Sequence, residues 1–249
     1  MKIETSIVIP FYKNLVLLKK ALKSVKKQSY KNYEIIIIYD NPHDHSLLIK
    51  LKKTLKNKFK KIKLIINSKN IGAGLSRNKG IKLAKGKFIA FLDSDDYWNK
   101  DKLSIQLSYM KKYNIDFSHT SYRIINLDNS KRKIREAKNL NYLNLLNSCD
   151  IGLSTVIIKK KFLRNKFLFP NLVTKEDYVL WLRLSKKGII LYGLKKVLSN
   201  WSNTPDSLSK PILQKLKDAY RVYRQYESLN LISSILRTII LSINYIKKN

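Results

Sequence analysis

The 249-residue chain contains one cysteine, seven glycines and five prolines, and each scarcity excludes a class of protein. The single thiol, Cys149, cannot build a disulfide scaffold or a cysteine-based zinc site, and it suits a reducing, cytoplasmic compartment. So few glycines and prolines leave no flexible linker. The opening residues 1–11 include the acidic Glu4 and an apolar run of only about five residues, too short for a secretion signal. Hydrophobic residues still make up 44% of the chain, which predicts a folded core.

Acidic residues are also scarce, because 17 Asp and Glu stand against 51 Lys and Arg, for a formal net charge of +34. Such an excess is typical of proteins that meet nucleic acid or an anionic membrane surface. Only nine of the basic residues are arginine, the residue that phosphate and base readers favour, so no nucleic acid is expected as a partner. The lysines indicate solvated faces, with attraction to an anionic membrane surface as the alternative.

Strand-like and helix-like patterns alternate through the first hundred residues. Short apolar runs predict strands at residues 6–11, 34–39, 62–66 and 88–92. Helical spacing predicts helices at residues 15–27, 46–58 and 75–85. This order predicts an α/β protein with an open, mostly parallel sheet flanked by helices, in which ligands bind beyond the carboxyl ends of the strands.

The pattern loosens in the second half. We expect helices at residues 100–112, 176–187 and 212–225 and strands at 116–121 and 155–158. The final stretch, residues 231–246, has one charge, Arg237. As a helix it would span roughly 24 Å, short of the ~30 Å hydrocarbon core, so it is expected to pack on the domain or lie in a membrane surface.

Carboxylates cluster where the sheet predicts a ligand. Asp40 follows the second strand, three more follow the fourth in the turn LDSDD (residues 92–96), and Glu176 and Asp177 open a later helix. Helix capping explains a single aspartate, but three carboxylates in four residues repel one another unless a cation or donors lie between them. Hard oxygen ligands of this kind favour Mg²⁺ or Mn²⁺.

The stretch before this turn, residues 70–91, adds a candidate anion site. Gly72 lies in a loop before a helix, and Arg77 is in that helix's first turn. A helix start with an arginine binds anions, so the loop and the acidic turn together predict a pocket for a diphosphate and a metal. The third glycine of a dinucleotide fingerprint is missing, which disfavours a dehydrogenase.

From residue 6 to about 209 the chain resembles the family 2 glycosyltransferases of the GT-A fold. The opening SIVIPFYKN resembles the family's first strand and loop, which implies that Pro10, Phe11 and Tyr12 line the donor nucleoside. YEIIIIYDNPHD resembles its acidic motif, with Asp40 as the aspartate that binds the base. Tyr39 and Pro42 depart from that motif.

The turn LDSDD resembles the family's DXD motif. By this resemblance Asp95 ligates the metal, Asp93 assists at the metal or ribose, and Ser94 lies at the donor. LVTKEDYVLWLRLSKKG resembles the family's acidic dipeptide at a helix start, which makes Asp177 the general base and Glu176 its neighbour. WSNTPDSLS resembles a stretch that commonly carries arginine and histidine, where this chain has Ser202 and Thr204.

The resemblance implies a domain at residues 1–210, with a nucleotide-binding half (1–96) and an acceptor and catalytic-base half (97–210), followed by C-terminal helices (211–249). It implies transfer of a sugar from a nucleotide-sugar donor, expected to be a UDP-sugar, to a glycan or lipid-linked acceptor. Inversion, a divalent metal, and a role in bacterial surface polysaccharide or lipopolysaccharide synthesis are implied as well. The expected location is the cytoplasm, peripheral at the inner face of the membrane.

Three alternatives stay open. A nucleotidylyltransferase needs a glycine-rich loop after the first strand, where FYKNLVLLKK has no glycine. A nucleic-acid module needs aromatics interleaved with arginines, whereas the 15 tyrosines are dispersed. A catalytically inactive relative of the glycosyltransferases would be consistent with the altered residues at 39, 42, 202 and 204.

Overall fold

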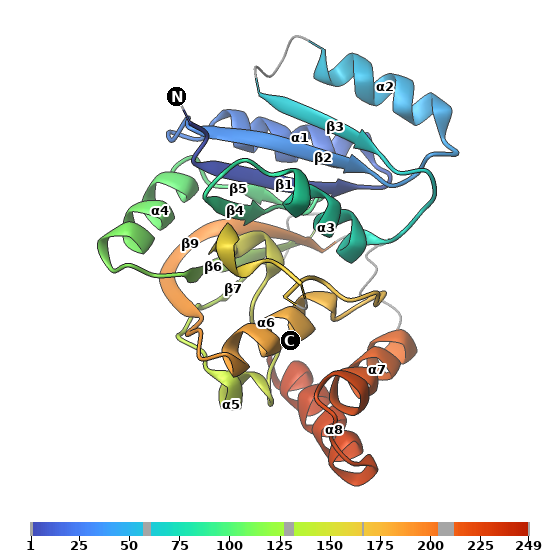
Figure 1. Cartoon of the computed structure of the whole chain (residues 1–249), viewed down its shortest axis with the longest axis vertical. Helices are drawn as coiled ribbons and strands as arrows, with labels where there is room; N and C mark the ends of the chain where they lie inside the picture. Colours follow the sequence, from blue (N-terminus) through green and yellow to red (C-terminus); the bar gives the residue numbers. More distant parts are fainter. Residues whose placement is uncertain (1, 57–60, 127–131, 166, 204–211, 249) are drawn as a thin grey trace.

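The computed structural model describes residues 2–56, 61–126, 132–165, 167–203 and 212–248 (Figure 1). The strands are β1 (Thr5–Phe11), β2 (Tyr33–Tyr39), β3 (Ile62–Ile66), β4 (Phe88–Phe91), β5 (Tyr97–Trp98), β6 (Phe117–Asn126), β7 (Arg132–Arg135), β8 (Ile157–Lys159) and β9 (Tyr192–Asn203). The helices are α1 (Leu15–Lys26), α2 (His45–Leu55), α3 (Ala73–Leu83), α4 (Lys102–Lys112), α5 (Tyr142–Leu145), α6 (Glu176–Lys186), α7 (Ile212–Arg221) and α8 (Leu231–Lys248). Short 3-10 turns lie at Leu153–Thr155 and Lys160–Phe162, and a π-helical turn lies at Val222–Tyr226.

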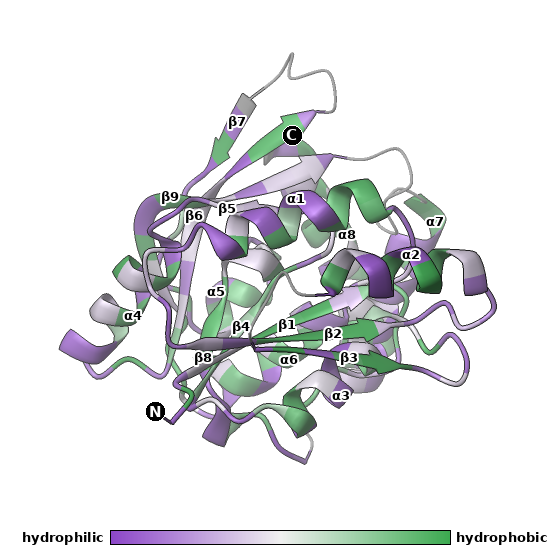
Figure 2. Ribbon diagram, turned by 90° about the horizontal axis from the view of Figure 1, so that it is seen from above, coloured by the Kyte–Doolittle hydropathy of each residue, from purple (hydrophilic) through white to green (hydrophobic). Residues whose placement is uncertain are grey.

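Alternation along β1 divides the core into two halves. Ile7 and Ile9 point into a cluster with α1, α2 and α4, whereas Val8 points to the opposite face, where α3 and α6 pack. The period of two follows from strand geometry, in which successive side chains face opposite sides of the sheet. Figure 2 shows the mostly hydrophobic strands β1 and β2, while α1 and α2 carry both hydrophobic and hydrophilic stretches. The sheet is therefore covered by helices on both faces, as the α/β pattern predicts.

The sheet is parallel in its first half and mixed in its second. Strands β3, β2, β1 and β4 lie in that order and pair in parallel, with Val8 beside Ile36 and Phe91. Beyond β4 the order continues through β8, β6, β9 and β5, and the pairings β4–β8, β8–β6 and β9–β5 are antiparallel. The predicted α/β fold is confirmed, and the antiparallel pairings explain why the alternation of strands and helices fades after residue 96.

Several elements differ from the sequence prediction. Strands β5, β7 and β9 and helix α5 were not predicted, and β6 runs to Asn126 rather than to residue 121. Helix α7 ends at Arg221, where the predicted helix continued to 225, because the chain enters the π-helical turn. Residues 57–58 of the predicted helix 46–58 lie outside the described residues, as do Thr204 and the domain boundary predicted at residue 210.

Helices α7 and α8 form a hairpin at the end of the molecule opposite α2 (Figure 1). Its inner side packs on the domain, because Leu241 is buried and the Arg237 guanidinium and the Asn244 amide both donate to Asn147. Its outer side leaves apolar residues exposed, among them Ile232 at 70%. The inner side of this helix packs on the domain, which was one of the two expectations, and the other, a position in a membrane surface, stays a prediction. In the part of the chain that the structure describes, no helix is both long and apolar enough to cross a membrane.

Candidate active site

A cleft of about 1800 Å³ opens beyond the carboxyl ends of β1, β2 and β4. This is the edge at which parallel α/β sheets bind ligands. Every residue that the sequence predicted for the site lines the cleft, namely Pro10, Phe11, Tyr12, Asp40, Gly72, Arg77, Asp93, Ser94, Asp95, Glu176 and Asp177. Helices α7 and α8 line the cleft with mostly apolar residues, including Leu216 and Tyr245, together with Lys215 and Ser242.

Asp40 organises the loop before α3, where the cleft meets the end of β2. Its Oδ1 accepts hydrogen bonds from Asn67 Nδ2 (2.6 Å) and Ile71 N (3.0 Å), and its Oδ2 accepts one from Gly72 N (2.8 Å). Gly72 has φ of 84°, a left-handed value that favours glycine, and this lets its N–H face the carboxylate at the start of α3. The binding of a base by Asp40 remains a prediction, and the structure adds a loop-holding role.

Phe11 and Tyr12, two of the three residues predicted to line the donor nucleoside, differ in their exposure to solvent. The Phe11 side chain is 1% exposed and packs on the Tyr39 ring with centroids 5.8 Å apart, whereas Tyr12 is 46% exposed at the mouth of the cleft. Tyr39 is itself buried and donates through its hydroxyl to Asp44 O (2.9 Å). Its side chain thus points into the core, where an aspartate would lack this packing.

The acidic turn after β4 holds three carboxylates in different environments. Asp96 is buried and accepts from Ser154 Oγ (2.6 Å) and Ser202 N (2.9 Å), and burial raises the pKa of this carboxyl. Asp95 is partly exposed to the cleft, and its burial together with the neighbouring Asp93 raises its pKa to about 6. The main-chain N–H of Ser202 does not depend on the side chain, so the missing arginine at this position leaves Asp96 supported.

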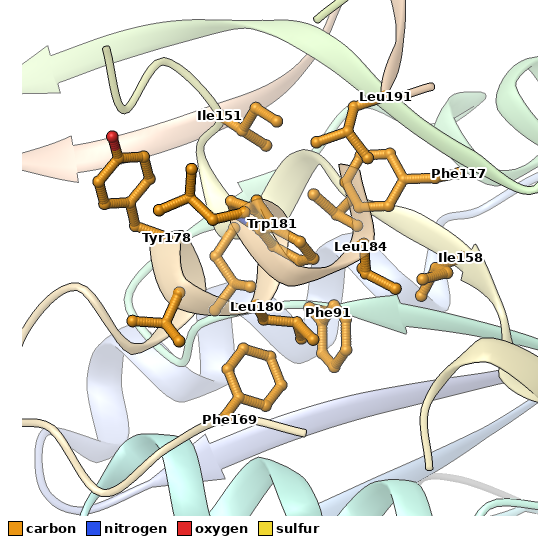
Figure 3. Packing of buried hydrophobic residues seen from close by; sticks show 14 of the residues in the cluster. Phe91, Phe117, Ile151, Ile158, Phe169, Tyr178, Leu180, Trp181, Leu184 and Leu191 are labelled. Carbon is orange, nitrogen blue, oxygen red and sulfur yellow. The ribbon is translucent and has the colours of Figure 1, made fainter. Parts of the chain in front are cut away.

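Glu176 and Asp177 open α6, where the positive end of the helix favours negative charge. The helix is fixed beneath them by its buried face, in which Trp181 packs edge-on against Phe117 with centroids 5.0 Å apart (Figure 3). Asp177 Oδ1 accepts from Tyr178 N at 2.7 Å. Burial raises the pKa of Asp177, and it raises the pKa of Glu176 to about 7 against the opposing effect of Arg77.

Arg77 joins the two acidic clusters. Its Nη2 lies 2.6 Å from Asp93 Oδ1 and its Nη1 lies 2.7 Å from Glu176 Oε1, although these carboxylates are 16 and 99 residues away in sequence. The guanidinium is 4% exposed, and the two carboxylates raise its pKa. Predicted as a clamp on the diphosphate, Arg77 has both terminal nitrogens engaged by protein carboxylates. Its contacts fit a residue that sets the distance between the acidic turn after β4 and α6.

Gly74 provides the close contact between α3 and α6. A Cβ at this position would lie 2.9 Å from Glu176 Cγ and 3.2 Å from Pro170 O. The absence of a side chain at Gly74 therefore lets the start of α3 approach the acid pair.

The carboxylates of the turn fit a divalent cation. Asp93 and Asp95 offer hard oxygen ligands, and the repulsion that raises the pKa of Asp95 is the kind that a bound cation relieves. Within the described ranges, no group of three or more His, Cys, Asp or Glu is arranged to hold a metal. Mg²⁺ and similar ions are commonly held by one or two carboxylates together with substrate phosphates.

Sequence comparison identifies the family. The profile described as "Glycosyl transferase family 2" matches residues 6–177, more than half of the chain. The chain belongs to glycosyltransferase family 2. The matched range contains the acidic turn and the acid pair of α6, whereas the cleft wall from α7 and α8 lies outside it.

This family 2 glycosyltransferase has relatives in bacterial polysaccharide synthesis. It is 35% identical to the Escherichia coli UDP-Glc:alpha-D-GlcNAc-diphosphoundecaprenol beta-1,3-glucosyltransferase WfgD, over 97% of this chain and 91% of that protein. It is 32% identical to Bacillus subtilis TuaG, provisionally assigned to teichuronic acid biosynthesis, over 90% of this chain and 89% of that protein. The solved structure of S. aureus TarS 1-349 with UDP-GlcNAc superposes with a TM-score of 0.73 at 22% identity, covering 93% of this chain and 69% of that one. The chain is thus a family 2 glycosyltransferase with the GT-A fold.

Sequence reasoning missed supporting residues of the site. Asn67 donates to Asp40 and to Ser76 Oγ, and its place directly after β3 was a usable signal. Ser154 donates to Asp96 and accepts from Asp93 N, but a lone serine 58 residues away carries no sequence signal. The histidines are outside the site: His43 and His45 are exposed, and His119 is buried against Lys138 O.

Proposed function

We propose that the protein transfers a sugar from a UDP-sugar to a lipid-linked glycan, with inversion at the anomeric carbon and with help from a divalent metal. In this proposal residues 1–96 bind the donor and residues 97–210 supply the acceptor side and the base. The observation that carries it is the pairing through Arg77, which holds the turn of Asp95 and the acid pair of α6 on one cleft.

The chemistry needs one base and one stabilised leaving group. The acceptor hydroxyl attacks the anomeric carbon from the face opposite the diphosphate, and its proton passes to the Asp177 carboxylate. The new C–O bond forms as the bond to the nucleoside diphosphate breaks, and the diphosphate leaves with the electron pair. Asp177 is suited to this because it lies on a different element from Asp95 and is partly exposed in the same cleft.

Asp95 and Asp93 would hold the metal in this reaction. A bound Mg²⁺ or Mn²⁺ supplies Lewis-acid stabilisation of the departing diphosphate, worth several kcal/mol. Arg77 would keep Asp93 in place through its 2.6 Å contact.

The acceptor is proposed from the relatives and from the cleft wall. WfgD is named for a diphosphoundecaprenol-linked acceptor, and the acceptor end of this cleft is walled by apolar residues such as Leu216 and Ile246. Because the lipid of such an acceptor lies in the bilayer, we place the enzyme peripherally at the inner face of the cytoplasmic membrane, with the α7–α8 hairpin toward the lipid.

A donor screen tests the donor and the metal together. Purified protein is incubated with individual UDP- and GDP-sugars, with Mg²⁺, Mn²⁺ or chelator, and with a synthetic lipid-diphosphate GlcNAc acceptor, and nucleotide release and product are measured. Transfer from a UDP-sugar that chelator abolishes supports the proposal. Transfer only from GDP-sugars contradicts the donor, full rates with chelator contradict the metal, and the anomeric configuration of the product decides inversion.

Asp177→Asn tests the base. The amide cannot take the hydroxyl proton, so turnover should fall by about 10²–10⁴-fold while donor affinity by calorimetry stays near the wild-type value. Asp150→Asn, a change of another cleft-lining aspartate outside the acid pair, is the control. If donor affinity collapsed together with turnover, Asp177 would be a binding or structural residue.

A further inference from the structure

The residues on either side of the acid pair are both held by the C-terminal part of the chain. Thr174 lies two residues before Glu176, and it bonds to Asp218, which is 44 residues further along. Tyr178 directly follows Asp177, and its hydroxyl contacts that of Tyr223, 45 residues further along. The acid pair thus lies between two tertiary contacts, or anchors, which join its neighbours to residues 44 and 45 positions further along the chain.

The first anchor is a buried carboxylate. Asp218 on α7 is fully buried, and its Oδ2 accepts hydrogen bonds from Thr174 N (2.9 Å) and Thr174 Oγ1 (3.0 Å). Gln214 Nε2 donates to the same oxygen at 2.9 Å. Loss of this carboxylate would leave the buried N–H of Thr174 unsatisfied, which costs about 1–3 kcal/mol.

The second anchor lies one turn later in the same segment. Tyr223 belongs to the π-helical turn, a rare geometry that is frequent at functional sites. Its hydroxyl donates to Leu146 O (2.9 Å) and lies 3.1 Å from the Tyr178 hydroxyl, while the two rings meet edge to face at 82°. The Tyr178 hydroxyl also donates to Leu145 O, so the first turn of α6 is fixed by two tyrosines.

The backbone between the anchors needs such support. Lys175, at the N-cap of α6, has φ of 67° and ψ of 10°, a left-handed conformation that costs a non-glycine residue about 1–2 kcal/mol. A residue persists in this conformation only when its surroundings determine it from both sides. Asp218 fixes the residue before Lys175, and the contact of Arg77 with Glu176 fixes the residue after it.

We propose that Asp218 and Tyr223 form a C-terminal clamp that positions Glu176 and Asp177 for the transfer step. The inference rests on the proposed function, in which Asp177 is the base. Neither Asp218 nor Tyr223 lines the cleft, so both are positioning residues that act through Thr174 and Tyr178. A displacement of the base by about 1 Å can cost on the order of 10²-fold in rate without a change in donor binding.

The test compares Asp218→Ala, Asp218→Asn and Tyr223→Phe with Asn244→Ala. The control removes a hydrogen bond of the same hairpin, from Asn244 Nδ2 to Asn147 O (2.8 Å), that does not reach the acid pair. The measurements are kcat, donor Kd by calorimetry, melting temperature and amide hydrogen exchange over residues 172–178. We expect Asp218→Ala and Tyr223→Phe to lower kcat at least about 10-fold with donor Kd within about two-fold, and to accelerate exchange in this segment. Asp218→Asn keeps an acceptor for Thr174 and should restore most of kcat, and Asn244→Ala should match the wild type.

Each contrary outcome has a distinct meaning. Unchanged kcat in folded Asp218→Ala and Tyr223→Phe overturns the clamp, and so does a parallel loss of kcat and donor affinity, which indicates a general disturbance of the cleft. A wild-type chain without any transfer overturns the proposed function instead. In that case the exchange measurement still decides the clamp, because unchanged exchange over residues 172–178 in Asp218→Ala shows that Asp218 does not hold the segment.

Discussion

The carboxylates of the cleft differ in the hydrogen bonds and ion pairs that they already make with the protein. These contacts decide which carboxylate is most available to a metal ion. Asp96 has two protein donors and is buried, and Asp93 is engaged by Arg77. Asp95 lies partly exposed beside Asp93 with a pKa raised to about 6. A cation that binds Asp95 therefore has to displace fewer contacts than one that binds Asp96.

Asp95→Asn should lower transfer by at least about 10²-fold, since Lewis-acid stabilisation is worth several kcal/mol, and should shift the metal titration to higher concentration. Initial rates against Mn²⁺ concentration measure both effects, with circular dichroism as the check of folding. Asp101→Asn, at the start of α4 and outside the cleft, is the matched control. Wild-type rates in the Asp95 variant with chelator present would remove the metal from the proposal. Asp93→Asn should weaken transfer less, because the Asp93 carboxylate is already engaged by Arg77 and Asp95 is proposed as the main metal ligand.

Lys102 is a second single-residue case, outside the site. Its Nζ is buried 4.0 Å from the centre of the Trp98 ring and has no hydrogen-bond partner among the residues that the structure describes. Burial lowers the pKa of this ammonium group well below its usual value. Between the lowered pKa of the folded state and the usual value of about 10.4, the Lys102 side chain keeps its proton in the unfolded chain and has lost it in the folded one. This residue therefore makes the free energy of unfolding rise with pH over that range.

Lys102→Met should therefore stabilise the protein at neutral pH, by about 1 kcal/mol or about 2–4 °C in Tm. The advantage should shrink as the pH approaches 10. Urea unfolding at pH 6, 7.5 and 9.5 measures it, and Lys112→Met, exposed at the end of the same helix, is the control. Equal stabilisation at all three pH values would contradict the explanation by burial of charge.

At the scale of elements, α3 connects the sheet to the acid pair through two glycines with different neighbours. A Cβ at Gly74 would meet Glu176 Cγ at 2.9 Å, whereas a Cβ at Gly80 would meet Val8 Cγ1 at 2.5 Å and Ile38 Cδ1 at 2.9 Å. The same substitution on one helix should therefore affect activity at one position and stability at the other.

Gly74→Ala should lower kcat by about 10-fold or more, because it displaces Glu176, while the better helix propensity of alanine offsets about 1 kcal/mol of the strain. Gly80→Ala should cost about 1–3 kcal/mol of stability through overpacking of β1 and β2, with kcat per folded molecule retained. Urea unfolding and initial rates on both variants separate the two effects. The reverse assignment, an inactive but stable Gly80→Ala, would show that the α3–α6 contact is not what positions the acid pair.

At the scale of the whole molecule, the α7–α8 hairpin presents an apolar and basic surface. Within residues 212–248 the two acidic residues, Asp218 and Glu227, are buried, so the charges it exposes are basic. Beside them lie exposed apolar side chains, including Ile232 (70%), Leu236 (55%) and Ile239 (48%). Apolar contact together with attraction of up to about 1 kcal/mol per basic residue favours an anionic bilayer.

The triple variant Ile232→Glu, Leu236→Glu, Ile239→Glu should lose binding to anionic vesicles, measured by flotation, because the new charges repel the headgroups. Its fold should persist, since these side chains are exposed. Deletion of residues 231–249 would be a poorer test, because it would also remove the buried Leu241. Ile49→Glu, at a side chain that is 67% exposed on α2 at the other end of the molecule, controls for the replacement of an exposed isoleucine by glutamate away from the hairpin. Undiminished flotation of the triple variant would place the membrane contact elsewhere.

The sequence by itself determined the first half of the fold and the main carboxylates that line the cleft. Buried parallel strands are continuous apolar runs, so β1 to β4 could be predicted from the sequence. The carboxylates that follow these strands indicated the edge of the sheet at which a ligand would bind. Asp95 and the pair Glu176–Asp177 could be named because each is local in sequence. Strand β9 could not be predicted, because its residues show no alternating apolar pattern. They form a strand because they pair with β6, with a bulge in the pairing.

Only the tertiary structure decided how these local groups are connected. The contacts of Arg77 with Glu176 and of Thr174 with Asp218 span 99 and 44 residues, and no pattern in the chain indicates a side-chain pair at such separations. The surroundings of the two faces of α8 were also decided by the tertiary structure. Apolar residues on a helix show that their face must be covered, but they do not show which surface covers it. The periodicity of apolar residues shows which face of a segment must be buried. The surface that buries this face depends on how segments distant in the sequence pack together.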